Sequence, residues 1–427
     1  MRALYVPFVV LFLVACGSSD NSGVPDAGSD AVVQPDINVV ETSVSYPAFT
    51  IDAPQSANQG GPVLTSPKVQ PVFFPGFDYA TELTDFTSKV GASMYWSGLS
   101  EYKVGAIVSA TPITLTSAQI VSADIGNITD AYIQAWLQAR FDGTHPEFGT
   151  TPDPSTIYTL YYPTATVISL ATISMTSDGG VSAGELSCQS FGGYHDNVTI
   201  NNVTVAYAVI PECPMFGDLV GVNVITATSS HELAEASSDP FPSSTPAYSQ
   251  VDENHFAWQS FLGGGEIGDL CAQFPTSFYV PTDLGYMVQR TWSNARATAG
   301  ADPCQPSDGT PYFNSMPVFN DTVAIRGGGM SPGIVVPVSS SKPLTIDLFS
   351  DSATSGPWTL TAQVYGRGGA AAPITLAFDN ATGSNGTQVN LTVTSTGALT
   401  STTKTATLVV TSTLGTRQNI WIGYVGQ

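Results

Sequence analysis

Two patterns of apolar positions alternate along the first two thirds of the chain. Runs of β-branched and aromatic residues predict strands at residues 69–74, 156–162, 165–173 and 203–210. Apolar residues at helical spacing predict helices at residues 79–90, 131–140 and 218–237, and Asp239-Pro240 ends the last of these. Strands that alternate with helices predict an α/β (α+β) domain, which we place at residues 46–305.

The pattern changes after Cys304. Short alternating runs rich in Thr and Val, separated by Gly, Asn and Asp, predict strands at residues 333–338, 344–349, 358–365, 374–378, 389–395, 406–411 and 419–425. Seven short strands at this spacing predict an all-β, immunoglobulin-like antiparallel sandwich at residues 306–427. This region contains no His and no Cys, so we expect no chemistry in it.

The first 45 residues have the character of an export signal and a tether. Arg2 precedes an apolar run at residues 3–14, and Leu13-Val14-Ala15-Cys16 resembles a bacterial lipobox. The run is shorter than the roughly 20 residues of a membrane span, so we predict a signal peptide at residues 1–15 and lipidation of Cys16. Residues 16–45 have the composition of a disordered tether. We therefore expect a bacterial cell-envelope protein, anchored by lipid to the outer membrane and facing the periplasm or the exterior.

The net charge restricts which partners the protein can bind, and the cysteines indicate the compartment in which it resides. A net charge of -22 argues against nucleic acid and anionic lipid headgroups as partners, because both require a basic patch. Export places the four remaining cysteines where disulfides form, and of the three possible pairings we favour Cys188 with Cys213 and Cys271 with Cys304. A four-cysteine zinc site is the alternative, but the C-x-x-C spacing is missing.

The sequence H-E-x-x-E at His231, Glu232 and Glu235 falls inside the predicted helix 218–237. Positions i and i+4 share a helix face, so His231 and Glu235 could hold one metal ion while Glu232 acts as the general base on a water. This is the pattern of a zinc hydrolase. The alternative is that both glutamates solvate an exposed helix face and His231 makes a local hydrogen bond.

The composition around the motif favours the metal. Residues 141–289 contain no Lys or Arg, yet they hold 16 Asp and Glu and all four His of the chain. Carboxylates buried there would have no cationic side chain of their own segment to pair with, which is costly. A divalent cation would balance them.

A zinc site needs about three protein ligands, so a third must come from outside the motif. The glycine-rich segment 263–271 offers Glu266 as our first choice and Asp269 as the second. Further candidates for either ligation or support of the ligands are His195, His255 and Asp239. His145, in Thr144-His145-Pro146, is interpreted as an ordinary loop residue.

Several of these segments resemble one protein family. Residues 229–240 (SSHELAEASSDP), 266–271 (EIGDLC) and 289–294 (QRTWSN), with 60–64 (GGPVL) and 193–195 (GYH), resemble bacterial relatives of the plant phosphate-induced, Exordium-like proteins. The resemblance covers roughly residues 55–304 and implies a secreted or cell-wall protein. Bacterial members that carry H-E-x-x-E look like zincin-type metallopeptidases by that motif.

The sequence thus predicts a lipid-anchored envelope protein whose metallohydrolase-like domain uses Zn²⁺ to cleave a peptide or cell-wall substrate. The alternative is a non-catalytic surface or adhesion lipoprotein that holds a structural Ca²⁺. Calcium prefers six to eight oxygen ligands and zinc accepts imidazole, so His231 favours zinc, while the many carboxylates leave calcium open. A degenerate domain kept for glycan binding would hold no metal.

Overall fold

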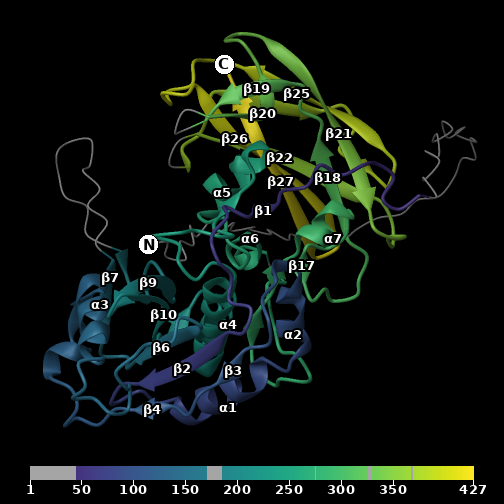
Figure 1. Ribbon diagram of the computed structural model, residues 1–427. Helices are drawn as coiled ribbons and strands as arrows, with labels where there is room; N and C mark the ends of the chain where they lie inside the picture. The colour runs from purple at the N-terminus through teal and green to yellow at the C-terminus, as the bar shows by residue number, and fades with distance from the viewer. Residues whose placement is uncertain (1–44, 171–184, 275, 326–328, 367–368) are drawn as a thin grey trace, which may run out of the picture.

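The computed structural model describes residues 45–170, 185–274, 276–325, 329–366 and 369–427. A mixed α/β region is followed by a largely β region (Figure 1). The predicted signal peptide, Cys16, the tether up to residue 44 and residues 171–173 of one predicted strand lie outside the described residues. Among the helices that are described, none combines the length and the apolar character that crossing a bilayer requires.

The α/β region is built on a mainly parallel sheet. Its strand order is β3-β2-β6-β10-β9, with β4 beside β2. Its strands are β2 (Lys68–Phe73), β3 (Val108–Ser109), β4 (Ile113–Thr114), β6 (Thr156–Tyr162), β9 (Tyr194–Ile200) and β10 (Val203–Pro211). Every residue of β6 is buried, as expected for a parallel strand covered on both faces. The predicted strands at 69–74, 156–162 and 203–210 are therefore confirmed.

Strand β9 is an element that our sequence analysis did not predict. It pairs antiparallel with β10 through a two-residue turn, so that Ile200 lies opposite Val203. The turn residues Asn201 and Asn202 have φ of 49° and 67°, which suits asparagine in the type of turn that closes a tight hairpin. The pair Asn201-Asn202 between two apolar runs was the available signal.

Helices cover both faces of this sheet. On one face α1 (Ala80–Val90) and α4 (Val222–Ser238) share a core with the sheet, and on the other α3 (Asp130–Ala139) completes a second core. These helices confirm the three helical predictions. A small separate sheet combines β5 (Asn127–Thr129), β7 (Val167–Leu170) and β8 (Glu185–Leu186).

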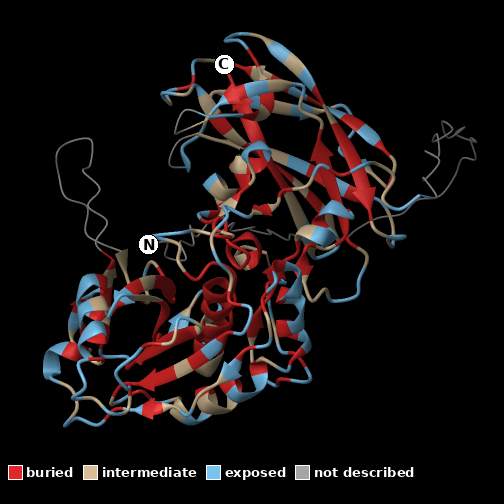
Figure 2. Ribbon diagram, in the orientation of Figure 1, coloured by how far each residue is buried: buried red, intermediate tan, exposed pale blue. Residues whose placement is uncertain are grey.

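Helix α4 is buried along nearly its whole length (Figure 2). It packs against β10, β9 and β6 on one side and against β15 (Val288–Gln289) on another. Its many small hydroxyl residues tolerate burial because they bond to their own helix: Ser230 donates to the Ala227 carbonyl and Ser237 to the Leu233 carbonyl. A central, all-round buried helix therefore carries the H-E-x-x-E motif.

The remaining elements of the α/β region are short. The helices are α2 (Met94–Ser97), α5 (Phe256–Leu262), α6 (Asp269–Ala272), α7 (Asn294–Thr298), η1 (Gly98–Tyr102), η2 (Ser122–Ile125) and η3 (Glu253–His255). The strands are β1 (Ser56–Ala57), β11 (Met215–Phe216), β12 (Leu219–Val220), β13 (Gln250–Val251), β14 (Phe278–Tyr279), β16 (Thr291–Trp292) and β17 (Cys304–Gln305).

The C-terminal region consists of two curled sheets that enclose a common apolar core. The first, of order β18-β21-β25-β23, contains β18 (Phe313–Pro317), β21 (Ser341–Ser350), β23 (Ile374–Phe378) and β25 (Gln388–Ser395). The second, of order β19-β20-β27-β26-β22-β24, contains β19 (Asp321–Ala324), β20 (Met330–Val335), β22 (Trp358–Tyr365), β24 (Thr382–Gly383), β26 (Thr405–Leu414) and β27 (Arg417–Gly426).

All seven strands predicted for this region are present, and β18, β19 and β24 were not predicted. Strand β25 alternates exposed and buried residues along its length, which is the pattern that made it recognisable. The pairs are antiparallel except for β20 and β27, which run parallel. The β-rich class is thus confirmed, whereas the immunoglobulin-like type remains a prediction.

An aromatic core joins the two regions. Trp258 of α5 lies 5.7 Å from Trp292 and 5.9 Å from Trp421 of β27, measured between ring centroids. Ile51, from the N-terminal segment, belongs to the same core, and the Ala48 amide donates to the side chain of Asn385. The segment that contains Ala48 and Ile51 therefore contacts the β region as well as the α/β region.

Replacing Trp258 with alanine tests whether this core contributes strongly to the free energy of unfolding of the protein. Trp258 is 2% exposed, so Trp258→Ala is expected to lower the free energy of unfolding by about 3–5 kcal/mol. The measurement is urea denaturation followed by circular dichroism. Val338→Ala, at a residue 49% exposed, is the control and should change stability by less than about 0.5 kcal/mol. Equal effects of the two variants would contradict the shared core.

Candidate metal centre

Seven ionisable side chains meet around the C-terminal half of α4. We call them the His-carboxylate cluster: His195, His231, Glu232, Glu235, Asp239, Glu266 and Asp269. They come from β9, from α4 and its C-cap, and from the loop that leads into α6. None is more than 9% exposed. The alternative of an exposed helix face is therefore wrong.

The first group of possible ligands combines His231, Glu235 and Asp269. The Nε2 atom of His231 lies 3.1 Å from Oε2 of Glu235 and 3.9 Å from Oδ1 of Asp269. The i, i+4 spacing of the helix brings the first two together, as the sequence pattern predicts. We had preferred Glu266 to Asp269 as the partner of this pair, and the structure instead groups Asp269 with them.

Glycines allow the loop of Asp269 to approach α4. The amides of Gly268 and Asp269 both donate to Oε1 of Glu235, at 3.0 and 3.1 Å, which fixes that carboxylate and leaves Oε2 facing the histidines. A Cβ atom on Gly268 would lie 2.6 Å from Nδ1 of His231, closer than such contacts allow. The side chain of Gln289 donates to the Gly268 carbonyl at 2.8 Å and holds the loop in place.

A disulfide secures the same loop from its other end. Cys271, two residues after Asp269, is bonded to Cys304, and Cys188 is bonded to Cys213. This is the nearest-neighbour pairing that the sequence analysis favours. Two disulfides are typical of a protein outside the cytoplasm.

The second group combines His195, Glu235 and Glu266. Nε2 of His195 lies 3.2 Å from the main-chain carbonyl oxygen of Asp239, which can only accept, so Nε2 carries a hydrogen and donates it. The other nitrogen, Nδ1, then faces Oε2 of Glu232 at 3.3 Å and Oε2 of Glu235 at 3.7 Å. Metal-binding histidines commonly donate their second nitrogen to a carbonyl in this way.

The sequence analysis names His195 as a further candidate for ligation or for support of the ligands, after Glu266 and Asp269. Its close approach to α4 depends on Gly193, where a Cβ atom would lie 2.5 Å from the side chain of Thr228. Asp239, the other supporting candidate that reaches the cluster, accepts at Oδ1 from the Ala247 amide.

The other two histidines lie outside both groups. His255 bonds through Nδ1 to Asp252 and through Nε2 to the Asp52 carbonyl, so both of its nitrogens are already engaged. We therefore withdraw it as a ligand candidate. His145 contacts Arg140 in a loop, in line with the ordinary role we expected.

Electrostatic coupling shifts the pKa values of the cluster strongly. Burial lowers the pKa of His231, but Glu235 and Glu232 outweigh it and raise that pKa to about 10. Burial also lowers the pKa of His195. The hydrogen bond to Glu232 and the charge of Glu232 outweigh burial and raise that pKa to about 9. Burial and the charge of Glu235 raise the pKa of Asp269 to about 7.

The charge of the cluster favours a cation. Five carboxyl groups face two imidazoles, and the Lys and Arg ion pairs of the described residues all lie elsewhere in the chain. Three buried atoms have no hydrogen-bond partner: His231 Nδ1, Asp239 Oδ2 and Glu266 Oε1. An excess of buried carboxylates with unsatisfied oxygens is costly, and a divalent ion bound by imidazole and carboxylate would relieve it.

No protein-family model matches the chain, and no curated protein matches its sequence. Among solved structures, the E. coli chaperone DraB aligns at 13% identity with a TM-score of 0.17, over 22% of this chain and 49% of the chaperone. Domains 4 and 5 of the S-layer protein SbsC align at 10% identity with a TM-score of 0.16, over 33% of this chain and 91% of theirs. The chain thus spans about half of the chaperone. TM-scores this low do not establish a shared fold.

Enlarging Gly268 should disrupt the centre without straining the backbone, because its φ of -78° is open to alanine. The new methyl group would press on His231 and Glu235, so Gly268→Ala is expected to weaken zinc binding at least about tenfold. Isothermal titration calorimetry measures the zinc affinity of each variant. Gly98→Ala is the matched control, since its Cβ meets nothing within 4 Å. Unchanged affinity in Gly268→Ala would show that the ion does not bind here.

The pKa of His231 predicts that zinc affinity depends on pH. With a pKa of about 10 in the metal-free protein, His231 carries a proton throughout the neutral range and must release it to bind an ion. Zinc affinity is therefore expected to rise with pH, by at least about 10²-fold from about pH 5.5 to about pH 7.5, because Asp269, with a pKa of about 7, must also be deprotonated. Competition titrations with a chelator at each pH measure the zinc affinity. An affinity that stays constant over this interval would show that His231 releases no proton on metal binding.

Proposed function

We propose that the protein is an exported metal-dependent hydrolase in which His231, Glu235 and Asp269 hold Zn²⁺. The observation that carries this proposal is the convergence of three buried ligand atoms within a cluster of five carboxyl groups, away from the Lys and Arg ion pairs of the described residues. Zinc is favoured over calcium because imidazole is a ligand of both possible groups.

The remaining cluster residues suit hydrolysis of an amide bond. When bound, the ion lowers the pKa of a water molecule and polarises the scissile carbonyl. Glu232, next to His231 on α4, would accept the proton that the attacking water loses and pass it to the leaving amine as the C–N bond breaks. His195, 3.3 Å from Glu232, would share that proton and hold the carboxylate in position.

The setting of this activity is also a proposal. Two disulfides support export. On the lipobox-like sequence at Cys16 we propose a lipid anchor in the bacterial envelope, with a peptide or cell-wall polymer as substrate and the β region as the part that positions the site. The resemblance to Exordium-like proteins fits a secreted or wall-associated role.

One observation favours a second function. No residue of the cluster is more than 9% exposed, which is typical of a closed structural site rather than an open catalytic one. The second candidate is therefore a non-catalytic surface or adhesion lipoprotein in which a bound Zn²⁺ or Ca²⁺ ties α4 to the loop of Asp269.

Replacing Glu232 with glutamine separates the two functions. Glu232→Gln keeps the size of the side chain but cannot take a proton, so peptide hydrolysis is expected to fall by about 10²–10⁴-fold while zinc content is unchanged. Zinc content by mass spectrometry and cleavage of a fluorogenic peptide library measure the two effects. His231→Ala and Glu235→Ala should lose the ion held by His231, Glu235 and Asp269 and, with it, activity.

Glu212→Gln is the matched control, since Glu212 is a buried glutamate outside the cluster. Removal of the ion by a chelator should abolish wild-type cleavage, and added zinc should restore it. Zinc bound without cleavage of any library peptide would favour the structural function. A wild-type chain that binds no metal would overturn both.

A further inference from the structure

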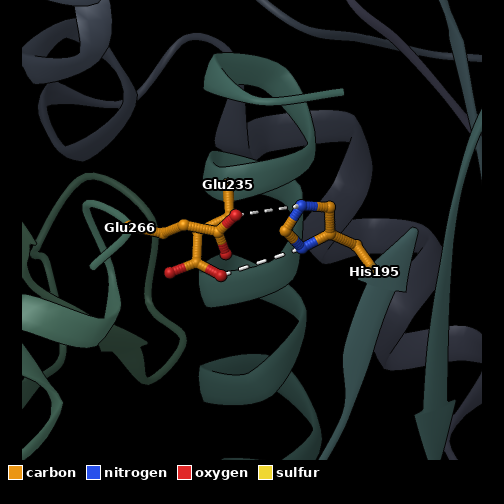
Figure 3. Close-up of side chains that lie close together, drawn as sticks. All are labelled: His195, Glu235 and Glu266. Atoms are coloured by element: carbon orange, nitrogen blue, oxygen red, sulfur yellow. Dashed lines mark ion pairs between the residues drawn. The ribbon is translucent and has the colours of Figure 1, made fainter. Parts of the chain in front are cut away.

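The cluster holds more ligand atoms than a single ion with three protein ligands uses. After His231, Glu235 and Asp269 are assigned, four residues of the cluster remain, and two of them, His195 and Glu266, are each at most 2% exposed and form a second possible ligand group with Glu235. Figure 3 shows the ring of His195 with one nitrogen toward Glu235 and the other toward Glu266. One ligand atom from each of these three residues lies within 4.8 Å of the others.

Glu235 belongs to both groups and is built to be shared. Its Oε1 atom is occupied by two main-chain amides, whereas Oε2 lies 3.1 Å from Nε2 of His231 and 3.7 Å from Nδ1 of His195. The same oxygen thus faces one imidazole nitrogen from each group. Paired ions in hydrolases lie about 3.5–4 Å apart, a separation that a bridging carboxylate spans.

Unsatisfied atoms gather on the side of the second group. Oε1 of Glu266 has no hydrogen-bond partner and lies 3.9 Å from Nε2 of His195. Oδ2 of the neighbouring Asp239 is also buried without a partner. One divalent ion would balance two of the five carboxylate charges, and a second would balance two more. The position beside Glu266 therefore has both the ligand atoms and the charge for another cation.

We propose that the centre is binuclear, with a second divalent transition-metal ion held by His195, Glu235 and Glu266 and with Glu235 as the bridge. This inference rests on the proposed metal site at His231, Glu235 and Asp269. His195 binds the second ion through Nδ1 in place of the proton it shares with Glu232, while the Asp239 carbonyl keeps Nε2 in place. Mixed imidazole and carboxylate ligands suit Zn²⁺ and Mn²⁺.

Metal stoichiometry of the full-length chain tests the proposal. The protein, purified in detergent, is dialysed against excess Zn²⁺, freed of unbound metal and analysed by mass spectrometry. We expect about two ions per wild-type chain and about one in each of Glu266→Gln and Asp269→Asn, which each remove one ligand that is not shared. Glu212→Gln should keep two. Loading with Mn²⁺ should give a spin-coupled paramagnetic resonance signal in the wild type that both single-ion variants lose.

The outcomes separate this inference from the function on which it rests. One ion in the wild type that persists in Glu266→Gln and disappears in Asp269→Asn would overturn the second position and leave the proposed zinc site standing. One ion that disappears in both variants would show a single site built from both groups, which also overturns the binuclear centre. No ion in a correctly folded wild type, checked by circular dichroism, would overturn the inference and the proposed function together.

Discussion

The architecture of the α/β region depends on one electrostatic constraint. Five carboxyl groups and two imidazoles are buried around α4, in a stretch of 149 residues, 141–289, that contains no Lys or Arg. Buried charge of one sign is unstable unless something of the other sign enters. A cluster that was merely solvated, or paired with surface lysines, would not need such isolation. The absence of basic side chains and the convergence of acidic ones are therefore two aspects of a cluster that could hold a cation.

Distant parts of the chain must be fixed to hold this cluster. Strand β9 supplies His195, α4 supplies the motif, and the loop before α6 supplies Glu266 and Asp269. The Cys271–Cys304 disulfide ties that loop to β17, and the core around Trp258 joins it to the β region. The β region therefore contributes to the site mechanically, although it contributes no ligand. This gives a physical reason for the β region to follow the α/β region.

Local patterns made part of this structure predictable. The pairing of His231 with Glu235 follows from helical spacing, and the buried strand β6 follows from its apolar run. The position of His195 does not follow from a local pattern, because it depends on the pairing of β9 with β10 and on the packing of α4 against that sheet. The choice between Glu266 and Asp269 likewise depends on how Gly268 lets the loop fold against Glu235. Sequence identifies the residues for such a site, whereas long-range packing decides which of them meet.

The position of Glu232 bears on the choice between catalysis and structure. A site selected for stability alone gains most when each buried carboxylate binds the ion or is fully hydrogen-bonded. Glu232 belongs to neither ligand group, and its contact within the cluster is the imidazole of His195. Burying such a group without using it as a ligand weakens the fold, and departures of this kind concentrate at functional sites. Zinc sites that only support a fold have little use for a basic carboxylate beside the ion, whereas hydrolysis requires one. This asymmetry weighs in favour of the hydrolase despite the low exposure of the cluster.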